Sequence, residues 1–273
     1  AVNIQGTTDQ VTAALVTDAT KVTASTATVE LDDGETPSIT QLNNIAAAAG
    51  VVTASLAANS LSNLGALTTA STDQITITVN DDAGTNVNAE DLSALGGKTA
   101  GTVTVSNAVN IQGTTDQVTA ALVTDDTKVT ASSALVTISD AGTTNIDATD
   151  LSAIGGKTGG AVTVSNAVNI QGNTAQVTAA LVTNETKVVA ANATVEISND
   201  STVAELNALA PKAGVITGSI AATSLASLSG LATAGTDLIT ITVNDNAGDN
   251  LNATALSALG GKTAGTVTVS NAV

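Results

Sequence analysis

The chain alternates between two hydrophobic patterns. Stretches such as "QITITV" (74–79) place aliphatic residues at every second position, which is the period of a β-strand with one buried face. Stretches such as "DLSALGG" (91–97) place leucines three positions apart, which is the spacing of one or two helical turns. The pattern therefore predicts short strands and short helices in alternation.

The helix boundaries have recognisable signals. Five segments have capping-box spacing, in which a small polar residue and a Gln or Glu three positions later satisfy each other's backbone amides: Thr7 with Gln10, Ser38 with Gln41, Thr114 with Gln117, Asn173 with Gln176, and Thr202 with Glu205. Six aliphatic pairs are expected to face inward from helices: Leu42 with Ile45, Leu61 with Leu64, Leu92 with Leu95, Leu151 with Ile154, Leu206 with Leu209, and Leu256 with Leu259. Three glycines are expected to end helices in the left-handed conformation: Gly96, Gly155 and Gly260.

The sequence repeats at two levels. Residues 1–107 and 167–273 are long repeats of 107 residues, and 108–166 is a 59-residue short repeat that keeps the opening and closing motifs but lacks the middle. Within them, units of 23 to about 30 residues run from strand to strand, as in 51–73 and 74–101. Loss of whole units without change to the flanks is typical of folds in which each unit contacts only its neighbours.

These repeats predict an α/β fold, namely one continuous repeat solenoid over residues 1–273 with about ten coils of 23–30 residues. Each coil would contain a β-strand, a turn and a short helix, and the strands would form a parallel sheet along a rod. The chain has no aromatic residue, Cys or Met, so its core consists of Ala, Val, Leu and Ile alone. Such uniform side chains suit a thin core that repeats from coil to coil, because no large ring is needed to fill irregular space.

The charge of the chain excludes two classes of partner. The formal net charge is −17, from 24 acidic residues against seven lysines. A surface of this sign repels nucleic acid and anionic membranes. The longest nearly apolar stretch, around residues 45–52, is much shorter than a membrane span, so membrane insertion is not expected.

The recurring unit also resembles a known group of proteins. It combines a strand, an Asn/Asp–Gly loop such as "NDDAGTN" (80–86) and a capped helix, in a chain rich in Thr, Ala, Val and Asn. This unit resembles the repeat regions of very large secreted bacterial surface proteins, in the style of cyanobacterial surface proteins, type I secreted adhesins and surface-layer proteins. The resemblance covers the whole chain and carries over no functional residue. It implies an extracellular or cell-surface location and a structural or adhesive role.

Acidic loops are the candidate metal sites. Oxygen-bearing side chains at alternating positions around a glycine suit calcium, and the candidate ligands are Asp81, Asp82, Asn86, Asp140, Asp147, Asp245 and Asp249. The loops lack the terminal glutamate of an EF-hand and the Gly-Gly-x-Gly-x-Asp nonapeptide of calcium-binding β-rolls. Asp and Asn also form ordinary turns and helix caps. Bound calcium and purely structural turns both stay open as interpretations.

"GGKT" occurs three times, at 96–99, 155–158 and 260–263, and it resembles the end of a phosphate-binding loop. A phosphate-binding loop needs an earlier glycine where Leu92 stands, and it must leave a strand and enter a helix. Here the order is reversed, since a helix precedes the motif and a strand follows it. The motif is therefore interpreted as a helix end with a lysine near the negative end of the helix dipole.

Two further functions are weighed from residue types. With no His, Cys or Arg the chain lacks the usual bases, thiolate nucleophiles and anion clamps, so an enzyme is not expected. Threonine pairs in the strands are the kind that form flat arrays on ice-binding solenoids, although Thr is also common on any exposed strand face: Thr76 with Thr78, Thr102 with Thr104, Thr240 with Thr242, and Thr266 with Thr268.

The sequence thus predicts a structural protein. We expect a rod that forms part of an extracellular fibre, sheath or surface layer, with copies of itself or adjoining repeats as head-to-tail partners. The alternative is a spacer or binding module of a giant adhesin, or an ice-binding surface.

Overall fold

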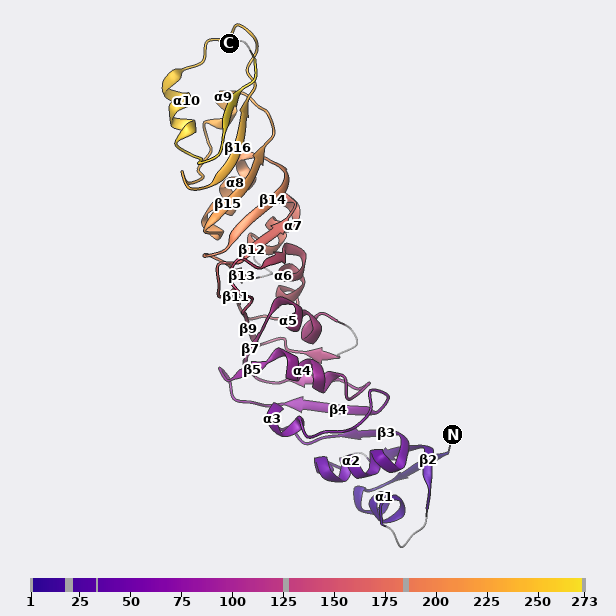
Figure 1. The fold of residues 1–273 in the computed structure, drawn as a ribbon. Helices are drawn as coiled ribbons and strands as arrows, with labels where there is room; N and C mark the ends of the chain where they lie inside the picture. Colours follow the sequence, from indigo (N-terminus) through magenta and orange to yellow (C-terminus); the bar gives the residue numbers. More distant parts are fainter. Residues whose placement is uncertain (1, 18–21, 33, 125–127, 184–186, 272–273) are drawn as a thin grey trace. The chain divides into compact units, whose positions relative to one another are not determined.

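The computed structural model describes residues 2–17, 22–32, 34–124, 128–183 and 187–271. Short helices alternate with parallel strands along the chain, which confirms the α/β class (Figure 1). The described residues include ten α-helices: α1 (Thr8–Leu15), α2 (Ile39–Ala48), α3 (Leu61–Leu64), α4 (Ala89–Gly96), α5 (Thr115–Leu122), α6 (Ala148–Gly155), α7 (Thr174–Leu181), α8 (Val203–Leu209), α9 (Leu225–Leu228) and α10 (Ala253–Gly260).

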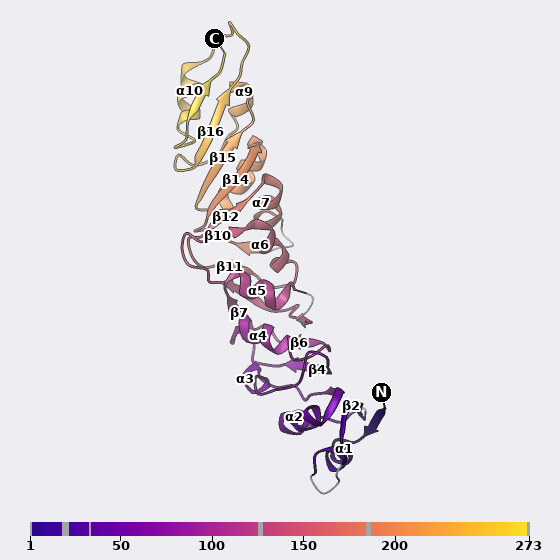
Figure 2. The ribbon, with the colours of Figure 1, turned by 45° about the vertical axis from the view of Figure 1, so that its right-hand side comes forward.

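The chain divides into two units. Unit 1 comprises residues 1–136 and 157–160, and unit 2 comprises residues 137–156 and 161–273. In each unit, successive helices and successive strands follow one another in chain order (Figure 2). Strand β9 (Leu135–Ile138) contains the division. One array over all 273 residues stays a prediction.

Unit 1 contains a parallel sheet whose strand order is β1-β2-β3-β4-β6-β8. Its strands are β1 (Asn3–Gly6), β2 (Ala24–Leu31), β3 (Ala49–Ser55), β4 (Gln74–Val79), β6 (Val103–Val105) and β8 (Val129–Thr130). A second parallel pair joins β5 (Asn86–Asn88) to β7 (Asn110–Gly113). Helix α1 packs on α2, α3 on α4, and α4 on α5.

Unit 2 repeats this plan with the strand order β10-β12-β14-β15-β16-β17. Its strands are β10 (Asn145–Asp147), β12 (Asn169–Gly172), β14 (Thr194–Ser201), β15 (Val215–Ile220), β16 (Leu238–Val243) and β17 (Val267–Val269). Another parallel pair joins β11 (Val162–Val164) to β13 (Val188–Val189). Helix α6 packs on α7, α7 on α8, and α9 on α10, and a 3-10 turn, η3 (Ala210–Lys212), follows α8.

Aliphatic side chains lie directly over their counterparts from strand to strand within each unit. In unit 2 the partners along β10, β12, β14 and β15 are Ile146, Ile170, Val195 and Ile216, and all four are buried. In unit 1 the partners Ile77, Val103 and Val129 are likewise buried. Because parallel strands lie about 4.8 Å apart, each aliphatic group contacts the one above it and the core excludes water without aromatic rings.

The five predicted capping boxes are all present. In each one the side chain of the first residue accepts a bond from the backbone amide three positions later, and the Gln or Glu there accepts one from the first residue's amide. The predicted inward pairs are buried in five of the six helices. In α10, Leu259 is buried but Leu256 is only half-buried, since no further helix covers that side among the described residues.

Two sequence predictions about local structure are wrong. Gly96 is the last helical residue of α4 and Gly97 follows it at φ −69°, so no left-handed glycine ends this helix. The same holds at Gly155 and Gly260, because the last turn closes through a right-handed capping glycine instead. Asn86, the last residue of the predicted loop 80–86, belongs to the short strand β5 (Asn86–Asn88), and residues 145–147 of the predicted loop 139–147 form the strand β10.

Candidate functional site

Acidic and amide side chains after several strands have a common structural role. Asp81 follows β4, and its carboxylate accepts a 2.7 Å hydrogen bond from the backbone amide of Leu61, the first residue of α3. Asp245 bonds the amide of Leu225 at the start of α9 in the same way, at 2.8 Å. These amides have no partner inside their own helices, and the helix dipole favours a negative charge beside them.

The same arrangement recurs at the other acidic segment. Glu35 accepts a 3.0 Å bond from the amide of Thr8, the first residue of α1, and this bond holds the pKa of Glu35 below its usual value. In unit 2 the neutral side chain of Asn199 does this for Thr174 of α7, at 2.7 Å. The capping residue, Glu35 after β2 and Asn199 within β14, thus caps the helix of the preceding repeat unit with or without a charge.

The remaining calcium candidates each make a different local contact. Asp249 accepts a 3.1 Å bond from the amide of Asn246 inside its own turn, and the Asn86 side chain accepts a 3.0 Å bond from Asn110 on the next strand. Asp147 lies at the start of α6 without capping it through its side chain. The carbonyls of Asp82 and Asp140 accept bonds from the amide of Thr85 and from the side chain of Asn166, respectively.

No group of three or more His, Cys, Asp or Glu side chains that could hold a metal ion occurs among the described residues. Asp81 and Asp245 are already bonded to helix amides, so a bound ion would have to share or replace those bonds. Calcium binding at these loops stays a prediction.

Polar ladders cover part of the outer strand faces. Gln5 and Asn3 on β1 donate to Glu30 on β2 at 2.6 and 3.3 Å, and these bonds lower the pKa of Glu30. On β14, Glu196 receives the equivalent bonds from Gln171 and Asn169, with the same effect on its pKa. Neutral amides therefore hold these carboxylates in fixed positions.

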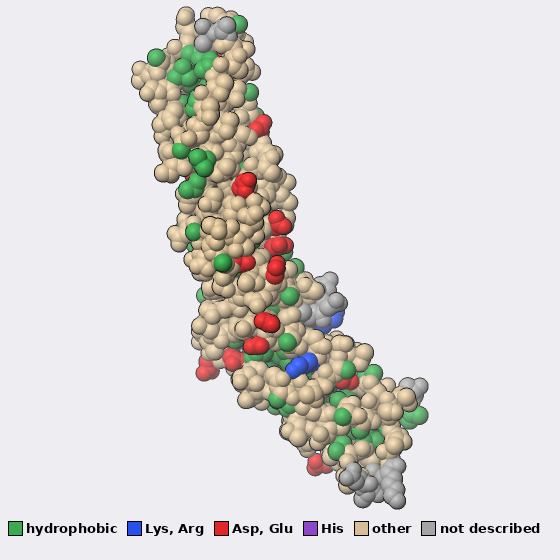
Figure 3. All heavy atoms as spheres, viewed as in Figure 1, with side chains coloured by type: hydrophobic (Ala, Val, Ile, Leu, Met, Phe, Trp, Pro, Cys, Tyr) green, Lys and Arg blue, Asp and Glu red, His purple; other side chains and the backbone are tan. Residues whose placement is uncertain are grey.

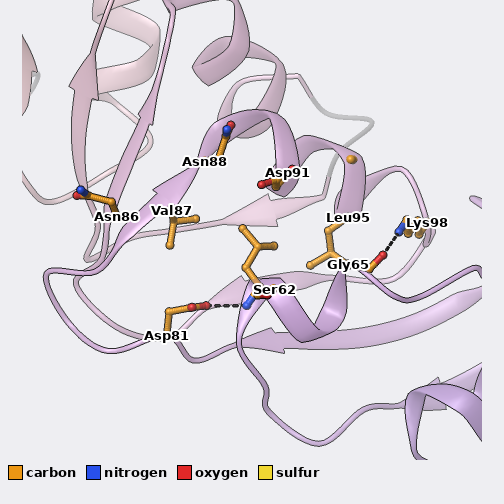
Figure 4. A pocket seen from close by; sticks show the side chains of 11 residues that line it. Ser62, Gly65, Asp81, Asn86, Val87, Asn88, Asp91, Leu95 and Lys98 are labelled. Carbon is orange, nitrogen blue, oxygen red and sulfur yellow. Dashed lines mark hydrogen bonds between the residues drawn. The ribbon is translucent and has the colours of Figure 1, made fainter.

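A groove in unit 1 lies between α3 and α4 and has a volume of about 480 Å³ (Figure 4). Leu61, Val87 and Leu95 line it with apolar groups, and Asp91 lies at its edge. Lys98 donates a 2.8 Å bond to the carbonyl of Gly65, just after α3, so its ammonium caps the neighbouring helix rather than its own.

The equivalent groove of unit 2, between α9 and α10, has a different chemistry. Its volume is about 150 Å³, and Ala255 stands where Asp91 stands in unit 1. A ligand site kept in both long repeats would need the same polar groups. The two grooves are best explained as gaps between short helices.

The "GGKT" motif holds neighbouring repeat units together through its threonine. The buried Thr99 hydroxyl accepts 2.8 Å bonds from the amides of Ile75 and Gly101, and it faces the carbonyls of Asp73 and Ile75. Thr263 makes the same bonds in unit 2, and Thr158 bonds the carbonyl of Ala134. Apart from the local bonds from Gly101 and Gly265, each bond joins the motif to backbone 24 or 26 residues earlier in the chain.

Gly101 completes this contact. A Cβ atom added there would clash with the backbone carbonyl of Ile75, and the same is true of Gly265 against Ile239. The "GGKT" motif, which follows a helix and precedes a strand, therefore forms a contact between repeat units.

Two buried carboxylates were missed by sequence reasoning. Asp73 accepts bonds from the amides of Val52 at 2.7 Å and Ala70 at 2.8 Å, and Asp237 does the same for Ile216 and Ala234. Both immediately precede a strand, in "TDQITITV" and "TDLITITV". An aspartate directly before a strand was therefore the sequence signal that could have identified them.

One threonine of each predicted pair lies in register with a threonine of the neighbouring strand, whereas Thr76 pairs with Ser55 and Thr102 precedes β6. In unit 1, Thr78, Thr104 and Thr130 are successive partners on β4, β6 and β8. In unit 2 Thr242 pairs with Thr268, whereas Thr163 on β11 meets a valine. The array is thus three threonines deep in unit 1.

No protein-family model, curated protein or solved structure matches the chain. Of the helices in the described ranges, none has both the length and the hydrophobicity to cross a membrane.

Proposed function

We propose that the protein is a structural, non-enzymatic solenoid rod that forms part of an extracellular fibre, sheath or surface layer. Each coil consists of a strand, a turn and a capped helix, and coils stack head to tail within the chain and between copies. The rod is stiff because every coil is fixed to the next by a parallel strand pair and a continuous aliphatic column.

One observation carries this proposal. The same side chains recur at equivalent positions of the two long repeats, and they bond a neighbouring coil rather than converging on a site. Thr99 and Asp73 bond preceding backbone, and Asp81 caps the preceding helix. A chain whose recurring polar side chains bond neighbouring coils is suited to forming a long, regular stack.

The experiment is immunogold electron microscopy of source cells with an antibody raised against residues 1–273. We expect gold label on regular structures outside the cell, and preimmune serum is the control. Label confined to the cell interior would contradict the proposed location and role.

The threonine column of unit 1 favours a second candidate, an ice-binding surface. Thermal hysteresis of the purified chain would support it, and Thr104→Lys would then abolish the effect. A surface-located chain that stays monomeric would instead support a spacer in a giant adhesin.

A further inference from the structure

Outward-facing side chains of β12, β14 and β15 form an ordered polar surface in unit 2. The residues between them on the same strands, such as Val195 and Ile216, are buried, so these side chains lie on the opposite face of the sheet. The strand register arranges them in two rows. We call this surface the polar platform of unit 2, and its rows are Asn169–Thr194–Val215 and Gln171–Glu196–Thr217.

Unit 1 has the same platform on β1, β2 and β3. Its rows contain the same residue types in the same order, Asn3–Thr28–Val51 and Gln5–Glu30–Thr53. Unlike the grooves beside α4 and α10, this surface therefore keeps its polar groups in both long repeats.

The short repeat lacks the platform. Leu135 and Thr137 of β9 stand where Thr194 and Glu196 stand in the long repeat. A 41% exposed leucine thus replaces a hydroxyl group, and the carboxylate is missing. The fixed carboxylate is a feature of the long repeats alone.

The carboxylate of the platform is held in place before any ligand binds. Glu196 accepts bonds of 2.7 Å from Gln171 and 3.1 Å from Asn169, and both reach Oε2. No bond to Oε1 occurs among the described residues, so this oxygen is available to a ligand. Because the side chain is already oriented, little conformational entropy is lost on binding.

A groove of about 420 Å³ lies over the platform of unit 2. Two turns complete its lining, at Thr143 and at Ala167, and the amide of Thr143 donates a 2.8 Å bond to the carbonyl of Ala167. The groove is therefore walled by backbone that is itself fixed. Its platform residues are Asn169, Thr194, Glu196 and Thr217.

The chemistry of the platform indicates the class of its ligand. Carboxylate, amide and hydroxyl groups bind sugar hydroxyls, and neighbouring strands lie about 4.8 Å apart, which is close to the length of one pyranose ring. A protein partner would need aromatic, Arg or large aliphatic anchors, and the platform has only one valine in each unit. Acidic side chains outnumber lysines on the face shown in Figure 3, and the net charge is −17, so an anionic polymer would be repelled.

We propose that each polar platform binds a neutral polysaccharide whose chain runs across the strands. Glu196 and the amides bond its hydroxyls, while Val215 and the threonine methyl groups contact the apolar face of a ring. Without an aromatic ring for stacking, one site is weak. A polymer compensates because a released segment is replaced by the next. Such binding adds a partner to the proposed rod and is independent of contacts between copies.

Binding of the whole purified chain to a printed polysaccharide array tests the proposal. The array contains neutral glucans, mannans, galactans and xylans, with polygalacturonate and alginate as acidic polymers. We expect binding to at least one neutral class and none to the acidic polymers. Absence of binding to every neutral polymer, or equal binding to the acidic ones, would overturn the proposal.

Carboxylate substitutions in both platforms locate the site. The double variant Glu30→Gln, Glu196→Gln leaves one oxygen for the neighbouring amides but removes the second acceptor oxygen. Calorimetric titration with the neutral polymer should show about tenfold weaker binding. The double variant Glu90→Gln, Glu205→Gln has the same net charge and should bind as wild type does. Equal weakening in both double variants would assign the effect to charge rather than to the platform.

Lysine substitutions provide a second test that does not depend on charge loss. Thr53→Lys with Thr217→Lys places a long side chain over each platform and should abolish binding. Thr104→Lys with Thr242→Lys, at outward threonines outside the platforms, is the matched control and should bind normally. None of the four threonines is buried, so circular dichroism should show native folding in both variants. Binding that persists in the first variant would contradict the proposal.

Cell labelling tests the proposed function separately. A chain that binds a neutral polysaccharide but lies inside the cell would remove the extracellular rod and keep this site. A chain outside the cell that binds no polysaccharide would do the reverse.

Discussion

At the scale of single residues, Thr143 carries measurable strain. Its φ is +69°, whereas the long repeats have Gly84 and Gly248 at the equivalent position, with φ of +80° and +89°. A left-handed conformation costs a residue with a Cβ about 1–2 kcal/mol, and the greater freedom of glycine in the unfolded chain offsets part of any gain. Thr143→Gly should therefore raise the free energy of unfolding by about 0.5–1 kcal/mol, measured by urea denaturation.

The reciprocal change is the control for Thr143. Gly84→Thr places a β-branched residue at φ +80° and should lower stability by about 1 kcal/mol. If both substitutions change stability in the same direction, backbone strain is not the cause.

The "GGKT" motif gives a second prediction, because its threonine and its lysine have separable roles. Thr99→Val keeps the shape but leaves the buried amide of Ile75 and the partly buried amide of Gly101 without their acceptor, so the unfolding free energy should fall by about 2 kcal/mol. Lys98→Ala removes one exposed bond to a carbonyl and should cost under about 1 kcal/mol. Thermal and urea unfolding of both variants measures the difference. A larger loss from Lys98→Ala would contradict this assignment.

The sequence indicated no partner for the threonine of this motif, for a physical reason. Its residues indicate a helix end followed by a strand, which is correct, but the acceptor role of Thr99 depends on the backbone of Ile75, in the preceding coil. Hydrophobic periodicity indicates which face of a strand or helix is buried. It does not indicate which backbone carbonyl or amide lies opposite a given side chain. The buried Asp73 escaped prediction in the same way.

At the scale of elements, the capping box of α8 makes one helix start sensitive to acid. Glu205 accepts a 2.8 Å bond from the Thr202 amide, which holds the pKa of Glu205 below its ordinary value of 4.5. A lowered folded-state pKa means that its stabilisation is complete above the unfolded pKa and is lost as pH falls through the folded value.

Glu205→Gln should remove this acid sensitivity, since the other four boxes use Gln at the same place. The difference in unfolding free energy between wild type and variant should be constant from about pH 6 to 8 and should shift against the wild type below about pH 4.5. Urea titrations at several pH values measure it. An unchanged difference at acid pH would show that the box does not titrate with folding.

The acidic loops supply a prediction about cations. If Asp81, Asp82 and Asn86 bind calcium, adding the ion should raise the melting temperature and EDTA should reverse the rise, because an ion bound only by the folded state stabilises it. Asp82→Ala should then reduce the effect without disturbing the bond from Leu61 to Asp81. Melting temperatures that are identical in calcium and EDTA would assign these loops to turns and caps alone.

Helix starts were predictable because a capping box is local, with both partners within four residues of chain. The short strands β5 and β10 were not, because three residues of mixed polarity give no period-two signal. They exist because β7 and β12 lie beside them in register. Asn86 and Asp147 consequently belong to strands, although their residue types indicated turns.

At the scale of the whole molecule, the repeat lengths predicted the order of elements, while the division into units did not follow from sequence. The long repeats themselves differ internally: β1 and β12 are offset by 166 residues, from Asn3 to Asn169, and β4 and β16 by 164, from Gln74 to Leu238. The two missing residues fall between Glu30 and Ser38, where β2 ends at Leu31. In the shorter counterpart, from Glu196 to Thr202, β14 continues to Ser201. This surface segment can change length because both versions keep the bond to the preceding helix, from the amide of Thr8 to Glu35 and from the amide of Thr174 to Asn199.

The short repeat indicates which larger deletion the fold should tolerate. Deleting residues 28–75 removes 48 residues and joins Ala27 to Thr76, which recreates the pattern found at Ala134 and Leu135. In a stack where each coil contacts only its neighbours, this excision keeps every remaining strand beside a compatible partner. We expect the shortened chain to fold and to unfold cooperatively in urea, with a slope about four-fifths that of the full chain, because the slope scales with the surface exposed.

A deletion out of register is the matched control. Removing residues 28–63 takes out fewer residues but joins the β2 segment to Leu64 at the end of α3, so the next strand is reached through a broken helix. This variant should lose cooperative unfolding even though more of the chain remains. If the smaller deletion is tolerated as well as the larger one, the coils are not the units of folding, and the stacking on which the proposed rod depends would have to be abandoned.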